Sequence, residues 1–252
     1  MPVFNEANRL SKTLTEFNKW INDESNTNTD YELIIIDDGS TDRTCEIILE
    51  FKNRINITLI NNEHHGQFFS IITGVKKAKN EYVVTLEADL SAHPKYVHTF
   101  LQYIQNYAVV SGSRLLKESK NYNKPLYRKI ISYMYSKMFR FFFKTNLTDP
   151  QIALKIYKRQ VFLKGSESLM SKYDGMKNSE ILLNILGKGN KIKEIPIEYF
   201  HSHSDRLVSI RNNLLSVLWK NLESFIIMWI SCKQKYRNKI YTIDISRFCF
   251  FK

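Results

Sequence analysis

The amino-acid sequence predicts an α/β fold with a mostly parallel central sheet flanked by helices. In residues 1–112, short apolar runs alternate with segments whose apolar residues recur at helical spacing, the pattern of strands joined by covering helices. The length of 252 residues is sufficient to bury a sizeable core without disulfides. The three cysteines show no C-x-x-C spacing, so neither a disulfide framework nor a zinc site is expected.

Five strands are expected, with a helix between each strand and the next. The first strand is short for a buried one. The helix after the second strand has a clear start signal, because Gly39-Ser40-Thr41-Asp42 offers hydroxyl and carboxylate caps before an apolar periodic segment. Strands are predicted at residues 2–5, 31–37, 55–61, 82–86 and 108–112, and helices are predicted to begin near Glu6, Thr41, Gln67 and Pro94.

Beyond residue 112 the sequence predicts basic amphipathic helices. One runs from Pro125 to about Lys144, and a second apolar and basic segment covers about 214–239. Such a helix either lies in a membrane interface or packs on the protein's own core, and both interpretations stay open. No uncharged apolar run reaches the length of a membrane span. The first helix carries its apolar residues at Tyr127, Ile130, Ile131, Met134, Met138, Phe141 and Phe142, with Arg128, Lys129, Lys137 and Arg140 between them.

Charge is distributed unevenly along the chain. Residues 1–110 contain 10 Lys and Arg against 15 Asp and Glu, a net charge of −5, and residues 111–252 contain 27 against 10, a net charge of +17. An acidic first part suits a cation site, and a basic second part suits an anionic partner such as a membrane or a phosphorylated acceptor. Nucleic acid is not expected, because no nucleic-acid-binding module is recognisable. Polar residues interrupt the N-terminus at once, so a signal peptide is not expected and the cytosolic side is favoured.

Two acidic pairs follow two of the expected strands. Asp37 and Asp38 end the strand at 31–37, and Glu87 and Asp89 follow the strand at 82–86. Ligands of open α/β sheets bind at this carboxyl edge, although capping and solubility also explain many such pairs. Carboxylate oxygens select magnesium or manganese, and an ion held there can neutralise the charge on a departing diphosphate.

The order of the motifs resembles that of family 2 glycosyltransferases. A later segment, Thr148 to Tyr157, resembles the polyprenyl-phosphate branch, the dolichyl-phosphate mannose and glucose synthases and their bacterial relatives. The resemblance extends from residue 2 to about residue 220. The motifs are Pro2-Val3-Phe4-Asn5-Glu6, Ile36-Asp37-Asp38-Gly39-Ser40-Thr41-Asp42, Gly66-Gln67, Glu87-Ala88-Asp89-Leu90 with Pro94, and Gly112-Ser113-Arg114, and Arg128, Ser132, Ile195-Pro196-Ile197 and His201 to Arg211 match the branch.

The resemblance implies a GT-A fold that binds a UDP- or GDP-sugar with Mg²⁺ or Mn²⁺. It implies inverting transfer to a dolichyl or undecaprenyl phosphate by a peripheral protein at the cytoplasmic face of a membrane. Residues 1–115 would form the nucleotide-sugar half of the domain, 116–205 the acceptor half, and 206–252 an amphipathic membrane-associating extension. By position, Pro2, Phe4, Glu6, Asp37 and Asp38 would hold the nucleotide, Glu87 and Asp89 the ion, and Arg114, Arg128, Ser132 and Arg206 the phosphates, with Asp89, Arg114 and Arg128 as the catalytic residues.

The chain departs from the family pattern at the metal motif. Glu87 stands where the family usually has Asp, and Ser91 stands where a third oxygen ligand is usual. A catalytically inactive nucleotide- or membrane-binding relative is therefore one alternative. Another is transfer to a saccharide or protein hydroxyl, for which Asp149 is the candidate base, whereas an anionic phosphate acceptor needs none. The adjacent His64 and His65 are interpreted as a surface turn.

Overall fold

The computed structural model describes residues 1–23, 30–167, 169–171, 174–201, 219, 222–223 and 225–230. Its first part is a parallel three-stranded sheet in the order β1-β2-β3. The strands are β1 (Pro2–Val3), β2 (Leu33–Asp37) and β3 (Ile57–Asn61). The run of Leu33 and three isoleucines in β2 suits a strand covered on both faces. β1 has only two residues, and it pairs with β2 only at Ile36 and Asp37.

The second part is a four-stranded sheet in the order β4-β7-β5-β8. It contains β4 (Tyr82–Thr85), β5 (Val109–Ser113), β7 (Lys155–Lys158) and β8 (Ile192–Pro196). β7 is antiparallel to β4 and β5, whereas β5 and β8 are parallel. A third, two-stranded sheet pairs β6 (Lys120–Tyr122) with β9 (Glu198–Phe200). The five strands expected from the sequence are all present, and the insertion of β7 between β4 and β5 was not predicted.

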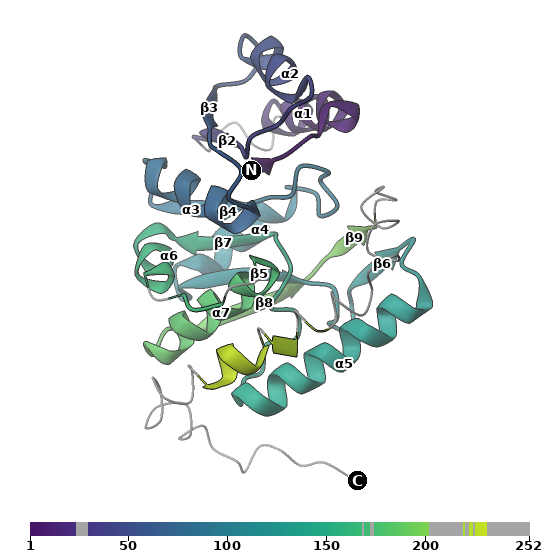
Figure 1. Ribbon diagram of the computed structural model, residues 1–252, viewed down its shortest axis with the longest axis vertical. Helices are drawn as coiled ribbons and strands as arrows, with labels where there is room; N and C mark the ends of the chain where they lie inside the picture. The colour runs from purple at the N-terminus through teal and green to yellow at the C-terminus, as the bar shows by residue number, and fades with distance from the viewer. Residues whose placement is uncertain are drawn as a thin grey trace.

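Helices cover the sheets on both faces (Figure 1). The two faces of the second sheet belong to two different hydrophobic cores, as adjacent residues of β5 show. Val110 packs with α1 and α4 on one face, whereas Val109 packs with α3, α6 and α7 on the other. The helices are α1 (Ala7–Ile21), α2 (Thr44–Phe51), α3 (Gln67–Lys77), α4 (Tyr96–Ile104), α5 (Leu126–Phe143), α6 (Arg159–Ser166) and α7 (Asp174–Gly187).

α2 begins at Thr44, later than the expected start near Thr41. Asp42 contacts the start of the helix as expected, because its Oδ1 accepts from the Thr44 amide at 3.0 Å, and its Oδ2 accepts from the Ala7 amide at 3.1 Å. Ser40 instead binds another loop, because its Oγ accepts from the Asn5 amide at 2.9 Å. These contacts attach the loop after β1 to the loop after β2. The two loops therefore form one rigid surface at the carboxyl edge of the first sheet.

α5 lies along one side of the molecule (Figure 1) and buries only a narrow stripe. Phe139 and Phe143 are almost fully buried, and residues 225–230 pack against this end through Phe225. Apart from residues 219, 222–223 and 225–230, the expected C-terminal extension, including Arg206, lies outside the described residues. In the described part of the chain, no helix is long and apolar enough to span a membrane. The exposed apolar side chains of α5 are Leu126, Tyr127, Ile130, Ile131, Tyr133, Met134, Phe141 and Phe142.

Candidate active site

The Glu87-Ala88-Asp89 triplet forms a turn directly after β4. Thr13 Oγ1 on α1 donates to the Ala88 carbonyl at 2.6 Å, and Ala88 itself is buried in the core. The Ser91 amide donates to Asp89 Oδ1 at 2.9 Å, and Leu90 adopts a left-handed conformation with φ of 46°. The two carboxylates are therefore presented by a fixed backbone turn and not by a loose loop.

Asp37 and Asp38 are buried at the end of β2. Asp37 accepts from the hydroxyl and amide of Ser40 and from the Cys45 thiol. Asp38 accepts from the His65 amide at 3.1 Å, from the Gly66 amide at 2.9 Å and from Ser70 Oγ at 3.0 Å. Gly66 has a φ of 99°, a conformation in which a side chain is strained. Asp38 thus fixes the turn that begins α3.

Phe4 and His64 form an aromatic surface beside these acids. Their ring centroids are 4.3 Å apart in a stacked arrangement, and His64 Nδ1 lies 2.9 Å from Asp38 Oδ2. The side chains of His64 and His65 are 59% and 51% exposed, as the surface-turn interpretation expects. The stacking of His64 on Phe4 was not predicted, because the two residues lie in separate loops.

Arg9 connects Glu6 with Asp89. Its guanidinium makes two contacts with the Glu6 carboxylate, one of them at 2.7 Å, and its Nη1 lies 3.9 Å from Asp89 Oδ2. The hydrogen bonds that Arg9 donates to Glu6 raise the pKa of Arg9, so Arg9 remains a cation. The sequence does not indicate that Arg9 contacts both acids. It does predict the helix on whose first turn Arg9 lies.

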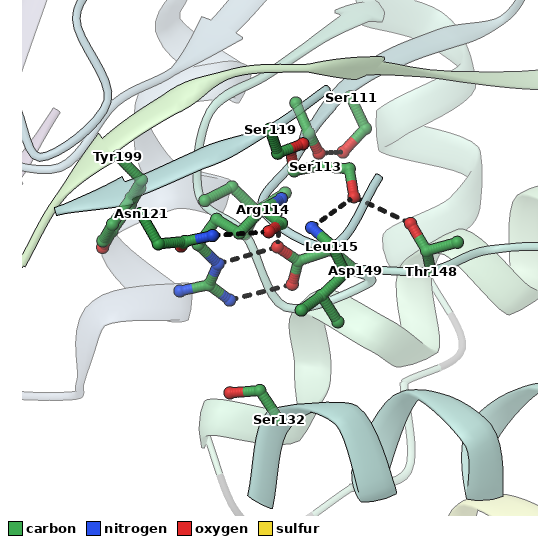
Figure 2. Close-up of polar contacts among 12 residues, drawn as sticks. Ser111, Ser113, Arg114, Leu115, Ser119, Asn121, Ser132, Thr148, Asp149 and Tyr199 are labelled. Carbon is green, nitrogen blue, oxygen red and sulfur yellow. Dashed lines mark hydrogen bonds and ion pairs between the residues drawn. The ribbon is translucent and has the colours of Figure 1, made fainter. Parts of the chain in front are cut away.

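Arg114 and Asp149 form a buried bidentate ion pair at the end of β5 (Figure 2). Arg114 Nε donates to Asp149 Oδ2 at 2.7 Å, its Nη2 donates to Oδ1 at 2.8 Å, and its amide donates to Oδ2 at 2.9 Å. Burial acts to raise the pKa of Asp149, but the contacts with Arg114 outweigh it and the pKa is lowered. A carboxylate held in this way is a weak base.

Tyr199 on β9 contacts the acidic triplet. Its hydroxyl donates to Glu87 Oε2 at 2.9 Å, and the Arg114 guanidinium lies 5.0 Å from the centre of its ring. Burial and the nearby charge of Asp89 raise the pKa of Glu87, and Arg114 and the Tyr199 hydroxyl oppose this effect. β9 is tied to the same turn by a hydrogen bond from the Phe200 amide to the Ser91 carbonyl at 2.8 Å.

Cationic side chains gather between Arg114 and α5. Lys124 donates to Ser132 Oγ at 2.9 Å, and Figure 2 shows Ser132 on the helix below the Arg114–Asp149 pair. Burial, followed by repulsion from Arg114 and Arg128, lowers the pKa of Lys124 to about 8. Burial and then Lys124 lower the pKa of His201 to about 4, and its Nε2 is buried without a hydrogen-bond partner among the described residues. Arg114, Lys124 and Arg128 therefore create a positive electrostatic potential at this place, which a bound anion would neutralise.

The expected site residues divide into two neighbouring groups. The nucleotide and metal candidates Pro2, Phe4, Glu6, Asp37, Asp38, Glu87 and Asp89 lie at the ends of β1, β2 and β4, whereas Arg114, Arg128 and Ser132 lie on the β9 and α5 side. Arg206 lies outside the described residues. Tyr199, Arg9 and Lys124 were not predicted.

A divalent ion fits the acidic triplet on chemical grounds. Glu87 and Asp89 provide hard oxygen ligands. Burial, and then repulsion from Asp89, raise the pKa of Glu87, and a cation between the two carboxylates would relieve that repulsion. In the described parts of the chain no group of three or more His, Cys, Asp or Glu side chains could hold a metal. Magnesium-type sites are commonly completed by substrate phosphates, so two carboxylates suffice.

Comparisons of the sequence with known proteins agree on one family. A sequence profile described as glycosyl transferase family 2 matches residues 1–165. The dolichol-phosphate mannosyltransferase of Pyrococcus furiosus is 30% identical over 134 residues, covering 52% of this chain and 37% of the relative. The undecaprenyl-phosphate 4-deoxy-4-formamido-L-arabinose transferase of Pectobacterium atrosepticum is 26% identical over 235 residues, covering 86% of this chain and 66% of the relative. The chain thus spans less than two thirds of the length of these relatives.

Solved structures show the same fold. Mannosyltransferase PcManGT from Pyrobaculum calidifontis, in complex with GDP-Man and Mn²⁺, superposes with a TM-score of 0.57 at 18% identity, covering 81% of this chain and 56% of that one. Glucosyl-3-phosphoglycerate synthase from Mycobacterium tuberculosis, in complex with Mn²⁺, UDP and glucosyl-3-phosphoglycerate, gives a TM-score of 0.61 at 14% identity, covering 88% and 77%. The expectation of a GT-A fold is confirmed.

Proposed function

Because the chain belongs to glycosyl transferase family 2, we propose that it transfers a sugar, with inversion, from a UDP- or GDP-sugar to the phosphate of a polyprenyl lipid. The observation that carries this proposal is the position of Arg114, which lies close to Glu87 of the acidic triplet and, on its other side, close to Lys124. The proposed reaction requires acids that hold a metal-bound donor and cations that hold an anionic acceptor, and the contact between Arg114 and Glu87 supports an arrangement in which the two groups are neighbours.

The donor nucleotide would lie over the loops at the ends of β1 and β2. Phe4, stacked on His64, would offer an aromatic surface for a base. Asp37 and Glu6 are buried and already accept hydrogen bonds from Ser40 and Arg9, and we propose that their remaining lone pairs hold base and ribose groups. Pro2 belongs to the strand that positions Phe4. Asp38 acts by holding the His64–Gly66 turn against this surface, since its oxygens accept from that turn.

Glu87 and Asp89 would hold Mg²⁺ or Mn²⁺ together with the donor diphosphate. A divalent ion at this position supplies charge neutralisation for the departing nucleotide diphosphate. Arg9 is positioned to share that task, because it is a cation within 3.9 Å of Asp89. The Tyr199 hydroxyl orients the Glu87 carboxylate, which is needed because glutamate has one more rotatable bond than the usual aspartate.

The acceptor phosphate would lie among Lys124, Arg128, Ser132 and His201. A phosphate oxygen is already anionic near neutral pH, so no base has to remove a proton from it, and orientation together with charge stabilisation supplies the catalysis. Transfer to a hydroxyl would require Asp149 as the base. Asp149 is bound to Arg114 with a lowered pKa, which favours the phosphate acceptor over the hydroxyl.

The exposed face of α5 would contact the membrane that contains the lipid acceptor. Leu126, Met134 and Phe141 are 72%, 63% and 78% exposed, and Lys129 and Lys137 lie on the same helix. Exposed apolar groups of this size, mixed with cations, suit a bilayer surface with anionic lipids. We therefore propose a peripheral position at a membrane, with α5 turned toward the bilayer, and we place it at the cytoplasmic face as part of the same proposal.

A transfer assay tests the proposal. The purified chain is incubated with each common UDP- and GDP-sugar and with undecaprenyl or dolichyl phosphate, with Mg²⁺, with Mn²⁺ or with EDTA, and lipid-linked sugar is extracted and measured. We expect one donor class to yield metal-dependent lipid product. Transfer to a saccharide or peptide hydroxyl without any need for lipid phosphate would contradict the proposed acceptor.

A further inference from the structure

Glu194 lies on a covered face of β8. Ile192, on the same strand, packs against the hydrophobic core under α6 and α7, and side chains at alternate positions of a strand point to the same face. The next residue, Ile195, belongs to the core on the opposite face. A carboxylate in such a position costs free energy unless hydrogen bonds satisfy it. The donors that bind Glu194 therefore indicate what it does.

The donors to the Glu194 carboxylate belong to one turn. Oε2 accepts from the Thr148 amide at 2.7 Å and from Thr148 Oγ1 at 2.9 Å, and Oε1 accepts from the Asp149 amide at 2.8 Å. An ionised carboxylate is an acceptor at both oxygens and so suits these donors. Burial raises the pKa of Glu194, and the hydrogen bonds from Asp149 and Thr148 oppose this effect. Glu194 thus fixes the backbone of the turn.

A first hydrogen-bond path connects Glu194 with Arg114 through Asp149. The Asp149 amide donates to Glu194, and the Asp149 carboxylate accepts from the Arg114 amide and from Nε and Nη2 of its guanidinium. Pro150 restricts the backbone of the residue before it, so the conformation of Asp149 has a second restraint. The carboxylate that pairs with Arg114 is therefore held in place at its own backbone.

A second path connects the same backbone with Glu194 through hydroxyl groups (Figure 2). The Leu115 amide donates to Ser113 Oγ at 3.2 Å, and the hydroxyl oxygens of Ser113 and Thr148 are 2.7 Å apart. The Thr148 hydroxyl donates to Glu194, so it accepts from Ser113. Hydrogen bonds thus run in one direction from Leu115 to Glu194, and the amides of Arg114 and Leu115 are both linked to this carboxylate.

The orientation of the Arg114 guanidinium depends on these two paths. Its Nε and Nη2 bind Asp149, whereas Nη1 makes neither of these contacts (Figure 2). The side chain of Arg114 is 18% exposed and that of Asp149 is 5% exposed, so the pair is more accessible on the Arg114 side. A guanidinium held on one edge can offer its other edge to a phosphate oxygen.

We propose that Glu194 is a positioning residue of the candidate site. It holds the turn at Thr148 and Asp149 and thereby directs Nη1 of Arg114 toward a substrate phosphate. The effect on sugar transfer rests on the proposed function, whereas the orientation of Arg114 does not.

Hydrogen exchange of the Arg114 Nε–H group tests the positioning without turnover. Its signal in a ¹⁵N–¹H spectrum is assigned by its absence in Arg114→Lys, and denaturant unfolding confirms that each variant is folded under the conditions used. Glu194→Gln places a donor opposite a backbone N–H, and we expect exchange to become about tenfold faster. Glu198→Gln on β9, whose carboxylate contacts the exposed Lys95 and Lys120, is the matched control and should not change it.

A double-mutant cycle tests the effect on transfer. We expect Glu194→Gln to lower kcat/KM by about tenfold, Arg114→Lys to lower it further, and the double variant to match Arg114→Lys, because the first residue acts through the second. A structural role without this connection predicts that the two factors multiply. Thr148→Val removes only the hydroxyl path, so its exchange should be about threefold faster, and it carries the test if Glu194→Gln does not fold.

The two measurements can fail separately. Unchanged Arg114 exchange in Glu194→Gln and in Thr148→Val, or factors that multiply in the double variant, would overturn the positioning role. Absence of transfer by the wild type would count against the proposed function, and the exchange rates would still decide whether Glu194 orients Arg114.

Discussion

The Tyr199 hydroxyl donates a hydrogen bond to Glu87 Oε2 at 2.9 Å and so connects β9 to the acidic triplet after β4. The same tyrosine ring lies against the Arg114 guanidinium, which is paired with Asp149. Tyr199 therefore touches both groups of the candidate site. Removing the Tyr199 hydroxyl should change the position of the Glu87 carboxylate and leave the Arg114–Asp149 pair in place, because the hydroxyl donates only to Glu87.

We expect Tyr199→Phe to weaken Mn²⁺ binding by about tenfold, because a hydrogen bond to a charged group contributes about 1.5 kcal/mol or more. Isothermal titration of Mn²⁺ in the presence of the nucleoside diphosphate measures the change without turnover. Tyr103→Phe, which removes a hydroxyl from the exposed side of α4, serves as the control. Equal Mn²⁺ affinity in wild type and Tyr199→Phe would show that Tyr199 does not position Glu87.

We expect Asp149→Asn to lower the free energy of unfolding by about 3–5 kcal/mol at pH 7, because Arg114 would remain as a buried charge without its partner. The pKa of Asp149 is below its ordinary value of 3.8 in the folded protein. The stabilisation is therefore present above pH 3.8 and is lost as the pH falls through the folded-state pKa. Denaturant unfolding at several pH values should show the difference between the two proteins shrinking below pH 3.8, with Glu46→Gln as an exposed control.

Lys124 should make acceptor binding sensitive to alkaline pH. Its pKa is lowered to about 8, so it loses its proton as the pH rises past that value, and its attraction for a phosphate declines. We expect the KM for polyprenyl phosphate to increase above pH 8 in the wild type. Lys124→Arg keeps its charge and should flatten this part of the pH profile, whereas Lys117→Arg should leave it unchanged. A donor KM that changes in the same way would contradict an acceptor-specific role.

The exposed face of α5 predicts membrane binding. Replacing both Leu126 and Phe141 by Ser should weaken binding to vesicles that contain anionic lipid by roughly a hundredfold, because each apolar side chain contributes about 1.5 kcal/mol on burial. Both residues are exposed, so the folded protein should keep its melting temperature. Vesicle flotation measures binding, and Leu49→Ser on α2 is the matched control. Unchanged flotation of the double variant would exclude this face.

The strands of the fold follow from the sequence because they are local apolar runs between turn signals. β2 and β5 are examples, and the structure changes their bounds by two residues or fewer. β7 was not predicted because its four residues begin with the buried Lys155, which interrupts the apolar pattern. The Lys155 side chain reaches the Ile152 carbonyl, a contact that no local rule indicates.

The acidic residues of the candidate site could be found for the same reason, since Asp37 ends β2, Asp38 follows it, and Glu87 and Asp89 come shortly after β4. The residues that hold them were not. Tyr199 lies 112 positions from Glu87 in the sequence, and only the placement of β9 beside the triplet brings them together. Arg114 was assigned to a phosphate, and the structure adds that its guanidinium is bound to Asp149.

Sugar transfer by wild type, Asp89→Ala and Glu87→Asp, measured side by side with polyprenyl phosphate and the active nucleotide sugar, tests the central claim most directly. Asp89→Ala removes one of the two carboxylates proposed to hold the ion, and Glu87→Asp restores the residue usual in the family. We predict metal-dependent lipid product with wild type, none with Asp89→Ala, and equal or greater turnover with Glu87→Asp. Full activity of Asp89→Ala would contradict the account.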